Sequence, residues 1–159
     1  SVRDGTGIVP CAAFEAAVIL STVAADMPRR LWANLAVNAG IDATTALADI
    51  DNGALLDGDA NSVATAAGRE VARVAAADGV DLSPNEAVAA VEGVAEATAA
   101  NTSSMRQDVL AERRTEVDAI NGYAVDRGEE VGVDVPVNET LAGLLRAWEA
   151  DHIESGERR

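Results

Sequence analysis

Three polar side chains are spaced so that they could act together on one helix face. Asn34, Asn38 and Asp42 follow one another at intervals of four residues, in a segment that is otherwise mostly apolar. Residues four apart share a face of an α-helix, so two amides and a carboxylate would line up and could bind a polar ligand. A solvated helix face gives the same pattern. Amides are uncommon as solubilising groups in a chain so rich in Asp and Glu, which favours a site.

A second group of polar residues comes later in the chain. It consists of Asn101, Ser103, Ser104 and, twelve residues after Ser104, Glu116. Such residues can bind a ligand, but they also cap helices. On the sequence alone we favour capping, with Ser104 closing a helix terminus and Glu116 placed at the positive end of the next helix. A binding site is the alternative.

Apolar residues at helical spacing predict the elements that would carry these groups. The first helix is expected from Pro28, a residue favoured at the first helical position, to about Leu47. A second helix is expected to contain Val63 and to end at Gly79. The segment Ser83-Pro84-Asn85-Glu86 is a capping box, which predicts the start of a third helix.

The C-terminal third is also predicted to be helical. A polar turn precedes a short helix from Met105 to Leu110, and another helix is expected over 115–127, ended by Gly128. Asn138 is expected to cap a last helix, with the tail frayed after His152. Only 3% of residues are aromatic and no clear strand pattern occurs, so the predicted fold class is an all-α bundle of about six to seven helices.

Charge and composition exclude several classes of function. The net charge is −15 and every one of the 12 basic residues is Arg, which excludes nucleic acid and anionic membranes as partners. So large an acidic excess suits a cytoplasm with high salt, where screening relieves self-repulsion. Cys11 is the only cysteine, and neither a membrane span nor a secretory signal is apparent. We therefore expect a cytoplasmic protein without a metal site.

Three stretches resemble a known family. The segment Leu31-Trp32-Ala33-Asn34-Leu35-Ala36-Val37-Asn38 is similar to the "LWxKLxxN" signature of ketopantoate reductases. Asn101-Thr102-Ser103-Ser104-Met105-Arg106-Gln107-Asp108 resembles the "NxSSMxQD" motif, and Arg114-Thr115-Glu116-Val117-Asp118-Ala119-Ile120-Asn121-Gly122 resembles "RxTEIDxING". The motifs occur in family order, with Pro136-Val137-Asn138 after them. The resemblance covers the chain from about Asp26 to about Glu149.

The resemblance implies a fold, a reaction and a set of roles. The family reduces 2-dehydropantoate with NADPH, using a Rossmann domain for the cofactor and a helical domain, similar to the C-terminal domain of 6-phosphogluconate dehydrogenase, for the substrate. By position, Glu116 matches the carboxylate that orients the substrate hydroxyl. Asn38, Asn101 and Ser104 match substrate-binding residues.

Two positions depart from the family pattern. Asn34 stands at the position of the lysine that serves as general acid, and an amide cannot release a proton at any working pH. Asp42 stands where the family usually has Asn, at a substrate-binding position, and it would place a second carboxylate near Glu116. Both changes lower the expected activity.

The resemblance also implies a division of the chain and a missing partner. Residues 1–26 are expected to be the end or remnant of an upstream nucleotide-binding domain, and residues 27–159 the helical domain. The single Gly-x-Gly, Gly5-Thr6-Gly7, has no preceding strand and is not a dinucleotide fingerprint. NADPH would therefore bind to a nucleotide-binding domain supplied in cis or in trans, and the helical domain is expected to form a homo-oligomer. The alternatives are a non-catalytic binding or dimerisation module and a remnant without function.

Overall fold

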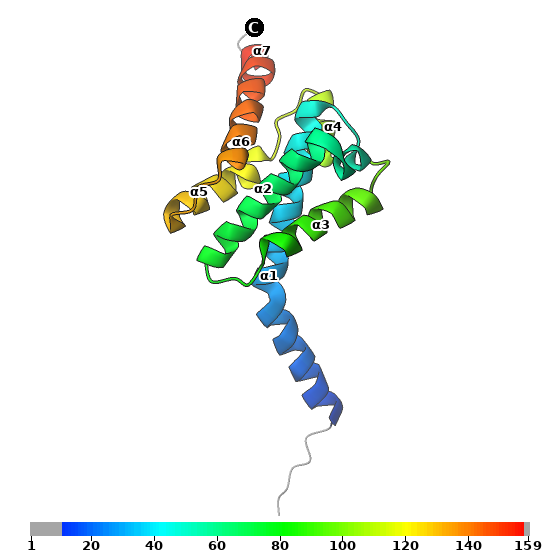
Figure 1. Ribbon diagram of the computed structural model, residues 1–159, viewed down its shortest axis with the longest axis vertical. Coiled ribbons are helices and arrows are strands. Elements are labelled where there is room, and N and C mark those ends of the chain that lie inside the picture. The colour runs from blue at the N-terminus through cyan, green and yellow to red at the C-terminus, as the bar shows by residue number, and fades with distance from the viewer. Residues whose placement is uncertain (1–10, 158–159) are drawn as a thin grey trace, which may run out of the picture.

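Helices form the whole fold in the computed structural model, which describes the backbone of residues 11–157 and the surroundings of the side chains from residue 26 to residue 156. No strand occurs among residues 11–157. This confirms the predicted all-α class. The elements are α1 (Cys11–Ala48), η1 (Asn52–Leu56), α2 (Gly58–Ala77), α3 (Pro84–Ala97), α4 (Ser104–Leu110), η2 (Val117–Ala119), α5 (Asn121–Val131), α6 (Pro136–Glu149), η3 (Ala150–Glu154) and α7 (Ser155–Glu157) (Figure 1).

The first helix is longer than the sequence suggested. We expected it to begin at Pro28, but α1 runs from Cys11 to Ala48 with Pro28 inside it. A proline within a helix removes one backbone hydrogen bond, yet its fixed φ is compatible with helical geometry. The preceding segment is rich in Ala, a strong helix former, and the structure continues the helix through the proline.

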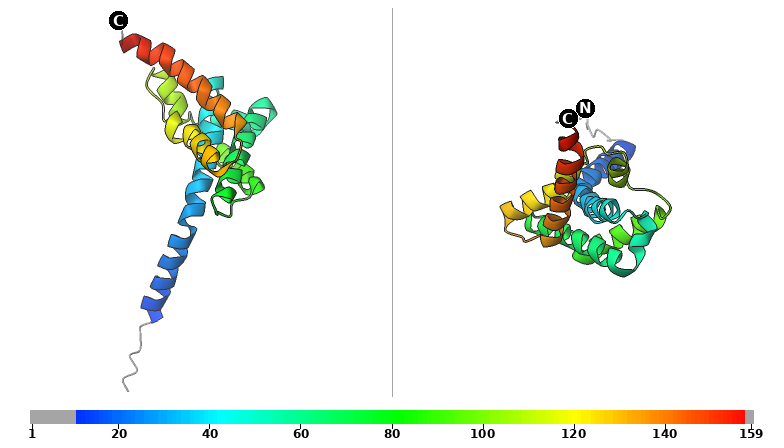
Figure 2. Two further views of the ribbon diagram at one scale, coloured as in Figure 1. Left: turned by 90° about the vertical axis from the view of Figure 1, so that its left-hand side faces the viewer. Right: turned by 90° about the horizontal axis from the view of Figure 1, so that it is seen from above.

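The other helices are arranged around the C-terminal part of α1, while the first turns of α1 extend beyond them (Figures 1 and 2). Helices α2, α3, α4 and α6 all pack against α1. The core is built largely from small residues, which allows the helices to approach closely. Its buried alanines include Ala36, Ala39, Ala43, Ala67, Ala72, Ala75, Ala87, Ala95, Ala124 and Ala142.

Helices α1 and α2 approach each other closely at Gly40. A Cβ atom at this position would come within 2.6 Å of the carbonyl oxygen of Ala64. Because a backbone atom cannot swing aside, we expect Gly40→Ala to push the two helices apart and to lower the free energy of unfolding by about 2 kcal/mol or more. Gly93, in α3, faces open space. Urea unfolding should show Gly93→Ala to be neutral or stabilising by about 0.5–1 kcal/mol; equal effects of the two substitutions would contradict this view.

The connection from α2 to α3 follows the sequence prediction. Gly79 has a φ of +83°, and the following amide of Val80 donates to Ala75 at 2.9 Å, which closes the helix end. The predicted capping box is formed, since the Glu86 amide donates to Ser83 Oγ at 3.1 Å and the Ser83 amide to Glu86 Oε2 at 2.8 Å. Arg29 of α1 also binds Glu86, at 2.7 Å.

A buried polar cluster joins the four helices α1, α2, α5 and α6. Asn121 Nδ2 of α5 donates to the carbonyl oxygen of Ala39 in α1 at 3.1 Å and to Asn138 Oδ1 of α6 at 3.0 Å. Asn138 Nδ2 donates to the carbonyl oxygen of Ala67 at 3.1 Å and to Glu70 Oε2 at 2.8 Å, both in α2. Asn121 and Asn138 are fully buried. We call Glu70, Asn121 and Asn138 the polar hub.

The C-terminal third corrects three expectations. The helix expected over 115–127 is instead the short η2 followed by α5, which ends at Gly132 with a φ of +74°, while Gly128 lies buried inside α5. Asn138 is not a cap. Pro136 is the first residue of α6, and Glu70 of α2 accepts the amides of Val137 and Asn138, each at 2.9 Å.

The third correction concerns the end of the chain. We expected a frayed tail after His152, but the helix continues from α6 through the π-helical η3 into α7. His152 stacks on Trp148 with ring centroids 4.9 Å apart, and its Nδ1 lies 3.0 Å from the carbonyl oxygen of Trp148. Both contacts join residues that are one turn apart in this continued helix.

Candidate functional site

The polar stripe of the first helix lies on the C-terminal part of α1. Asn34 is exposed, Asn38 is half-buried, and the side chain of Asp42 is buried, so the stripe descends from the surface into the bundle over two turns. The helical register predicted from the spacing of four is thus present. The depth of each residue is set by the helices that pack around the end of α1. We call Asn34, Asn38 and Asp42, together with Glu116, the site face.

The start of α4 is fixed to α1 just beyond Asp42. The hydroxyl groups of Thr45 and Ser103 lie 2.7 Å apart and are buried. Ser103, and not Ser104 as expected, caps α4, because its Oγ accepts the amide of Arg106 at 3.2 Å. Ser104 is the first residue of α4 and is exposed, so its hydroxyl is not needed for capping. Of the two adjacent serines, Ser103 therefore caps α4, and Ser104 leaves its hydroxyl exposed.

A charged contact also joins α4 to the segment after α1. Arg106 donates from Nε to Asp49 Oδ1 at 2.9 Å and from Nη1 to Asp51 Oδ1 at 2.6 Å. Both carboxylates raise the pKa of the Arg106 guanidinium. The positive charge of Arg106 is therefore already paired with Asp49 and Asp51.

Glu116 is positioned by its neighbours rather than by its own side chain. Thr115 is buried, and its amide and hydroxyl both donate to Glu149 Oε1, at 2.7 and 2.6 Å. Val117 on the other side is fully buried. Glu116 itself is exposed and makes no side-chain cap for η2. Two buried neighbours therefore present an exposed carboxylate, and no pattern in the sequence indicates that Glu149 anchors this segment.

Asp42 and Glu116 interact electrostatically although they belong to different elements. Burial, the larger effect, together with the negative charge of Glu116 raises the pKa of Asp42 from 3.8 to about 6. Burial penalises the charged form of the carboxyl, and a second negative charge does the same. The site face therefore contains a carboxyl group that takes up a proton in the mildly acidic range.

The raised pKa makes Asp42 a destabilising residue at neutral pH. A shift of about two pH units corresponds to about 3 kcal/mol. The folded state binds this proton more tightly than the unfolded state, so stability from this group is complete below pH 3.8 and is lost as the pH rises to about 6. We expect Asp42→Asn to stabilise the protein by about 2–3 kcal/mol at pH 7.5 and by little at pH 4.

Urea unfolding at the two pH values measures this difference. The matched control is Asp134→Asn, which changes an exposed acid in the loop between α5 and α6. This control should be nearly neutral at both pH values. A gain for Asp42→Asn that is equal at pH 4 and pH 7.5 would show that packing, and not the proton, causes it.

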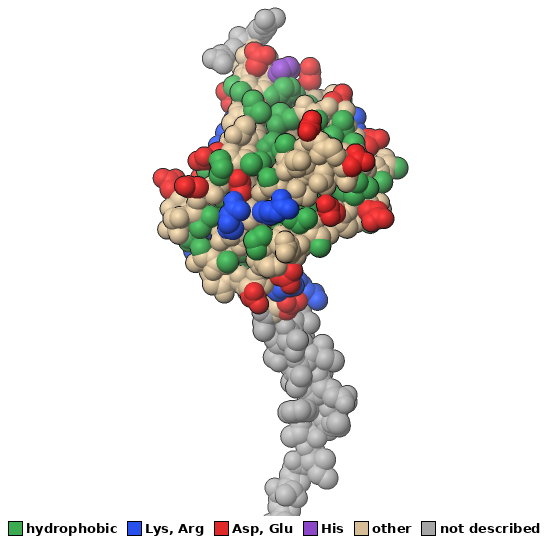
Figure 3. Space-filling model, viewed as in Figure 1, with side chains coloured by type: hydrophobic (Ala, Val, Ile, Leu, Met, Phe, Trp, Pro, Cys, Tyr) green, Lys and Arg blue, Asp and Glu red, His purple; other side chains and the backbone are tan. Residues whose placement is uncertain are grey.

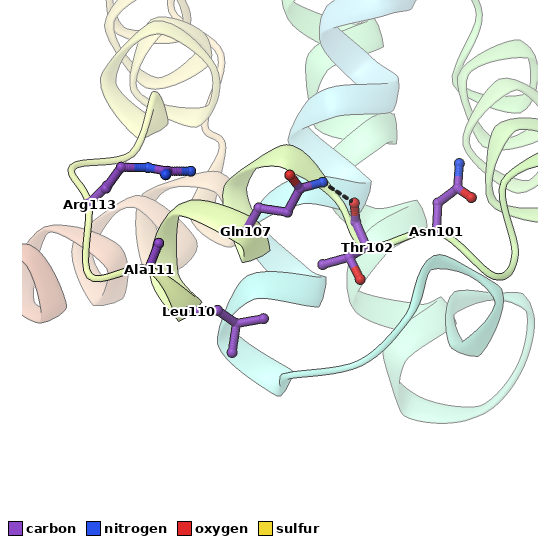
Figure 4. Close-up of a pocket in the computed structure, with 6 residues that line it drawn as sticks. All are labelled: Asn101, Thr102, Gln107, Leu110, Ala111 and Arg113. Carbon is purple, nitrogen blue, oxygen red and sulfur yellow. Dashed lines mark hydrogen bonds between the residues drawn. The ribbon is translucent and has the colours of Figure 1, made fainter.

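Asn101 lines an open pocket of about 740 Å³, whose lining includes no residue of α1. The pocket is also lined by Thr102, Gln107, Leu110, Ala111 and Arg113. Gln107 donates to the carbonyl oxygen of Thr102 at 2.9 Å and lies between Arg113 and Asn101 (Figure 4). Arg113 is paired with Asp108 at 3.1 Å. The Asn101 side chain is exposed beside this pocket and makes no described hydrogen bond there.

An apolar groove of about 620 Å³ lies beside the exposed start of the site face. Leu31 is 61% exposed, Tyr123 is 47% exposed, and Met27 is 44% exposed. Trp32 forms the floor and contacts Tyr123 with ring centroids 5.9 Å apart. One aromatic residue, Tyr123, and two apolar ones, Leu31 and Met27, are thus open to solvent in this groove.

The surface seen in Figure 3 has acidic side chains spread over it, with a few basic ones gathered near its centre. Among the described residues, no group of three His, Cys, Asp or Glu side chains is placed to hold a metal ion. None of the described helices has the length and apolar character required to cross a membrane.

The fold and the site face define a helical domain that carries two amides and two carboxylates on α1 and just before η2. The sequence profile of the family described as "Ketopantoate reductase PanE/ApbA C terminal" matches residues 26–149. The chain belongs to this family, as its C-terminal helical domain.

Similar proteins support this assignment. The chain is 43% identical to the 2-dehydropantoate 2-reductase of Halobacterium salinarum over 141 residues, which cover 88% of this chain and 46% of that protein. A crystal structure of a probable 2-dehydropantoate 2-reductase from Bacillus subtilis matches with a TM-score of 0.72 and 34% identity, over 78% of this chain and 42% of that one. D-mandelate dehydrogenase in complex with NADH matches with a TM-score of 0.71 and 27% identity, over 76% and 42%. The chain spans less than half the length of these relatives.

Proposed function

We propose that the chain is the substrate-binding half of an NADPH-dependent 2-dehydropantoate 2-reductase and is inactive alone. The observation that carries this proposal is the site face: Asn34, Asn38 and Asp42 on one side of α1, with Glu116 close enough to act on Asp42. All four lie within the residues that match the family. The product would be pantoate, a precursor in pantothenate and coenzyme A synthesis.

Each residue of the site has a proposed role. Glu116 is the catalytic carboxylate that hydrogen-bonds the reacting oxygen, and its exposed position suits contact with a ligand. Asn34 donates a hydrogen bond to the same oxygen but cannot supply its proton. Asn38, Asp42, Asn101 and Ser104 bind the rest of the substrate.

The described residues do not form a Rossmann dinucleotide site. A Rossmann site needs a strand, a Gly-rich turn and a helix in succession, and residues 11–157 contain no strand. We propose that NADPH binds to a nucleotide-binding domain that joins this chain in cis or in trans, with residues 1–26 at the junction. The NADH found with the similar D-mandelate dehydrogenase supports a nicotinamide cofactor.

The exposed apolar residues suggest that the domain has protein partners. Leu31, Leu110 and Leu144 are each more than half exposed. Leu31 belongs to the contiguous apolar groove with Met27 and Tyr123, and a contiguous apolar surface often marks a site of protein contact. We propose that the domain contacts the nucleotide-binding domain and a second copy of itself, in the cytoplasm of a cell with high internal salt.

The proposal is tested by NADPH oxidation with 2-dehydropantoate in molar KCl. The chain is assayed alone and with a separately produced nucleotide-binding domain of the Halobacterium relative. Activity is expected only with the added domain, and Glu116→Gln should reduce it by on the order of 10²–10⁴-fold. The matched control is Asp118→Asn. Asp118 lies in η2, two residues after Glu116, and is exposed and paired with Arg146 at 2.8 Å. Absence of activity in every combination, with the chain folded, would reject the proposal.

A non-catalytic binding or dimerisation module is the second candidate. The observation that favours it is Asn34, which leaves the site face without the family's general acid. Such a module would show no turnover with any added domain and would bind pantoate weakly or not at all. Sedimentation in molar KCl would then show whether it self-associates, and a chain that does not fold alone would indicate a remnant.

A further inference from the structure

Asp42 is an unusual residue in its surroundings. The residue as a whole is only 9% exposed, yet no described side chain donates a hydrogen bond to its carboxyl group. Its backbone carbonyl oxygen is occupied, since Thr45 Oγ1 lies 3.2 Å from it. A charged carboxylate is rarely buried without hydrogen-bond donors, because burial removes the water that would solvate it. Its carboxyl oxygens are not among the fully buried side-chain atoms without a partner, so they still reach the surface and can meet a ligand.

The surrounding charges do not neutralise Asp42. Among the charged groups of the neighbouring elements, Glu116 is the one whose field acts on it. The cation of α4, Arg106, is held by Asp49 and Asp51, and the buried acid of α2, Glu70, accepts the first amides of α6. The remaining charged side chains on α2, α3, α4 and α6 are Asp59, Arg69, Arg73, Glu86, Glu92, Glu96, Asp108, Glu139, Arg146 and Glu149.

We propose that Asp42 binds the acid substrate in its protonated form, donating a hydrogen bond from its carboxyl group to an oxygen of the ligand, so that binding of the anion takes up one proton. This inference rests on the proposed function. Its basis is the position of Asp42 on the face of α1 that carries Asn34 and Asn38, its burial, and its lack of a described donor. Asp42 is a specificity-determining residue in this scheme.

The electrostatics make proton uptake the favourable route. A 2-oxo or 2-hydroxy acid carries a negative charge, and two ionised carboxylates at the site face would repel it. A protonated carboxyl instead gives a short, charge-assisted O–H···O⁻ hydrogen bond. Because the free group titrates near pH 6, the affinity should fall by about tenfold for each pH unit above that value.

The experiment is isothermal titration of the 159-residue chain with pantoate in molar KCl, between pH 5.5 and pH 8. At pH 7.5 it is repeated in two buffers that differ in their heat of ionisation. We expect an uptake of nearly one proton for each pantoate bound. Asp42→Asn should bind without proton uptake, with an affinity that does not depend on pH and is more than tenfold higher than that of the natural chain at pH 7.5. Asp134→Asn, the exposed control, should behave like the natural chain.

The outcomes separate the two proposals. Binding of pantoate with an affinity that does not change with pH, and without proton uptake, overturns the role of Asp42 and leaves the proposed function standing. Failure of the natural chain and of both variants to bind pantoate at any pH overturns the proposed function and the role of Asp42 with it. Loss of binding in Asp42→Asn alone also overturns the proposed role of Asp42, because an amide should replace the protonated acid as a hydrogen-bond donor.

Discussion

Replacing Asn34 by lysine is expected to increase the rate of 2-dehydropantoate reduction by on the order of 10²–10⁴-fold, when a nucleotide-binding domain is supplied. The amide of Asn34 can polarise a carbonyl group by one hydrogen bond, but it has no proton to give. A lysine ammonium at the same position adds a positive charge and a transferable proton. The Asn34 side chain is exposed at the N-terminal end of the polar stripe on α1, so the longer lysine has room.

The assay follows NADPH oxidation in molar KCl and compares four chains. Asn34→Lys is set beside Asn34→Met, which has similar length without charge, and beside the pair Asn34→Lys with Glu116→Gln. We expect the methionine variant to be no faster than the natural chain and the double variant to lose most of the gain. An equal rate for Asn34 and lysine would mean that another group supplies the proton, and our account of this position would be wrong.

Asn138→Ala is expected to lower the free energy of unfolding by about 4 kcal/mol. The change removes the partner of Asn121 and two hydrogen bonds to α2, all in a fully buried region. Each buried polar group left without a partner costs about 1–3 kcal/mol, and more where the group is charged, as Glu70 is. The loss should be visible in urea unfolding at pH 7.5 without any change in the site face itself.

Asn85→Ala is the matched control for the polar hub. Asn85 is exposed in the first turn of α3, so its truncation should change stability by no more than about 0.5 kcal/mol. Glu70→Gln should interact with Asn138→Ala, because each removes part of the same set of hydrogen bonds. Effects of these two substitutions that simply add would contradict the hub.

The sequence was sufficient where the signal is local. The spacing of Asn34, Asn38 and Asp42 places them on one face, and Ser83 with Glu86 forms a capping box in four residues. Pro28 was misinterpreted, since a proline that can begin a helix can also lie within one. Ser103 and Ser104 are equally good caps by type, so the structure was needed to tell which one binds the Arg106 amide.

The features that depend on distant contacts could not be predicted from one sequence. Glu70 looks like an ordinary surface acid in a helix, yet it is 2% exposed and caps a helix that begins far along the chain. Similarly, nothing near Glu116 in the sequence indicates that Glu149 holds the preceding threonine. The family resemblance proposed the site residues, but only the folded chain brings the charge of Glu116 to bear on Asp42.

The polar hub also bears on the time course of synthesis. Its hydrogen bonds join residues that are 68, 71 and 82 positions apart. Closing such long segments is slow compared with pairing adjacent helices such as α1 and α2. On the ribosome, α2 is made well before α6, so Glu70 stays in water until residue 138 has emerged. The bundle that supports the site face is therefore completed only near the end of translation, and a chain halted before α6 would leave α1 and α2 without their shared support.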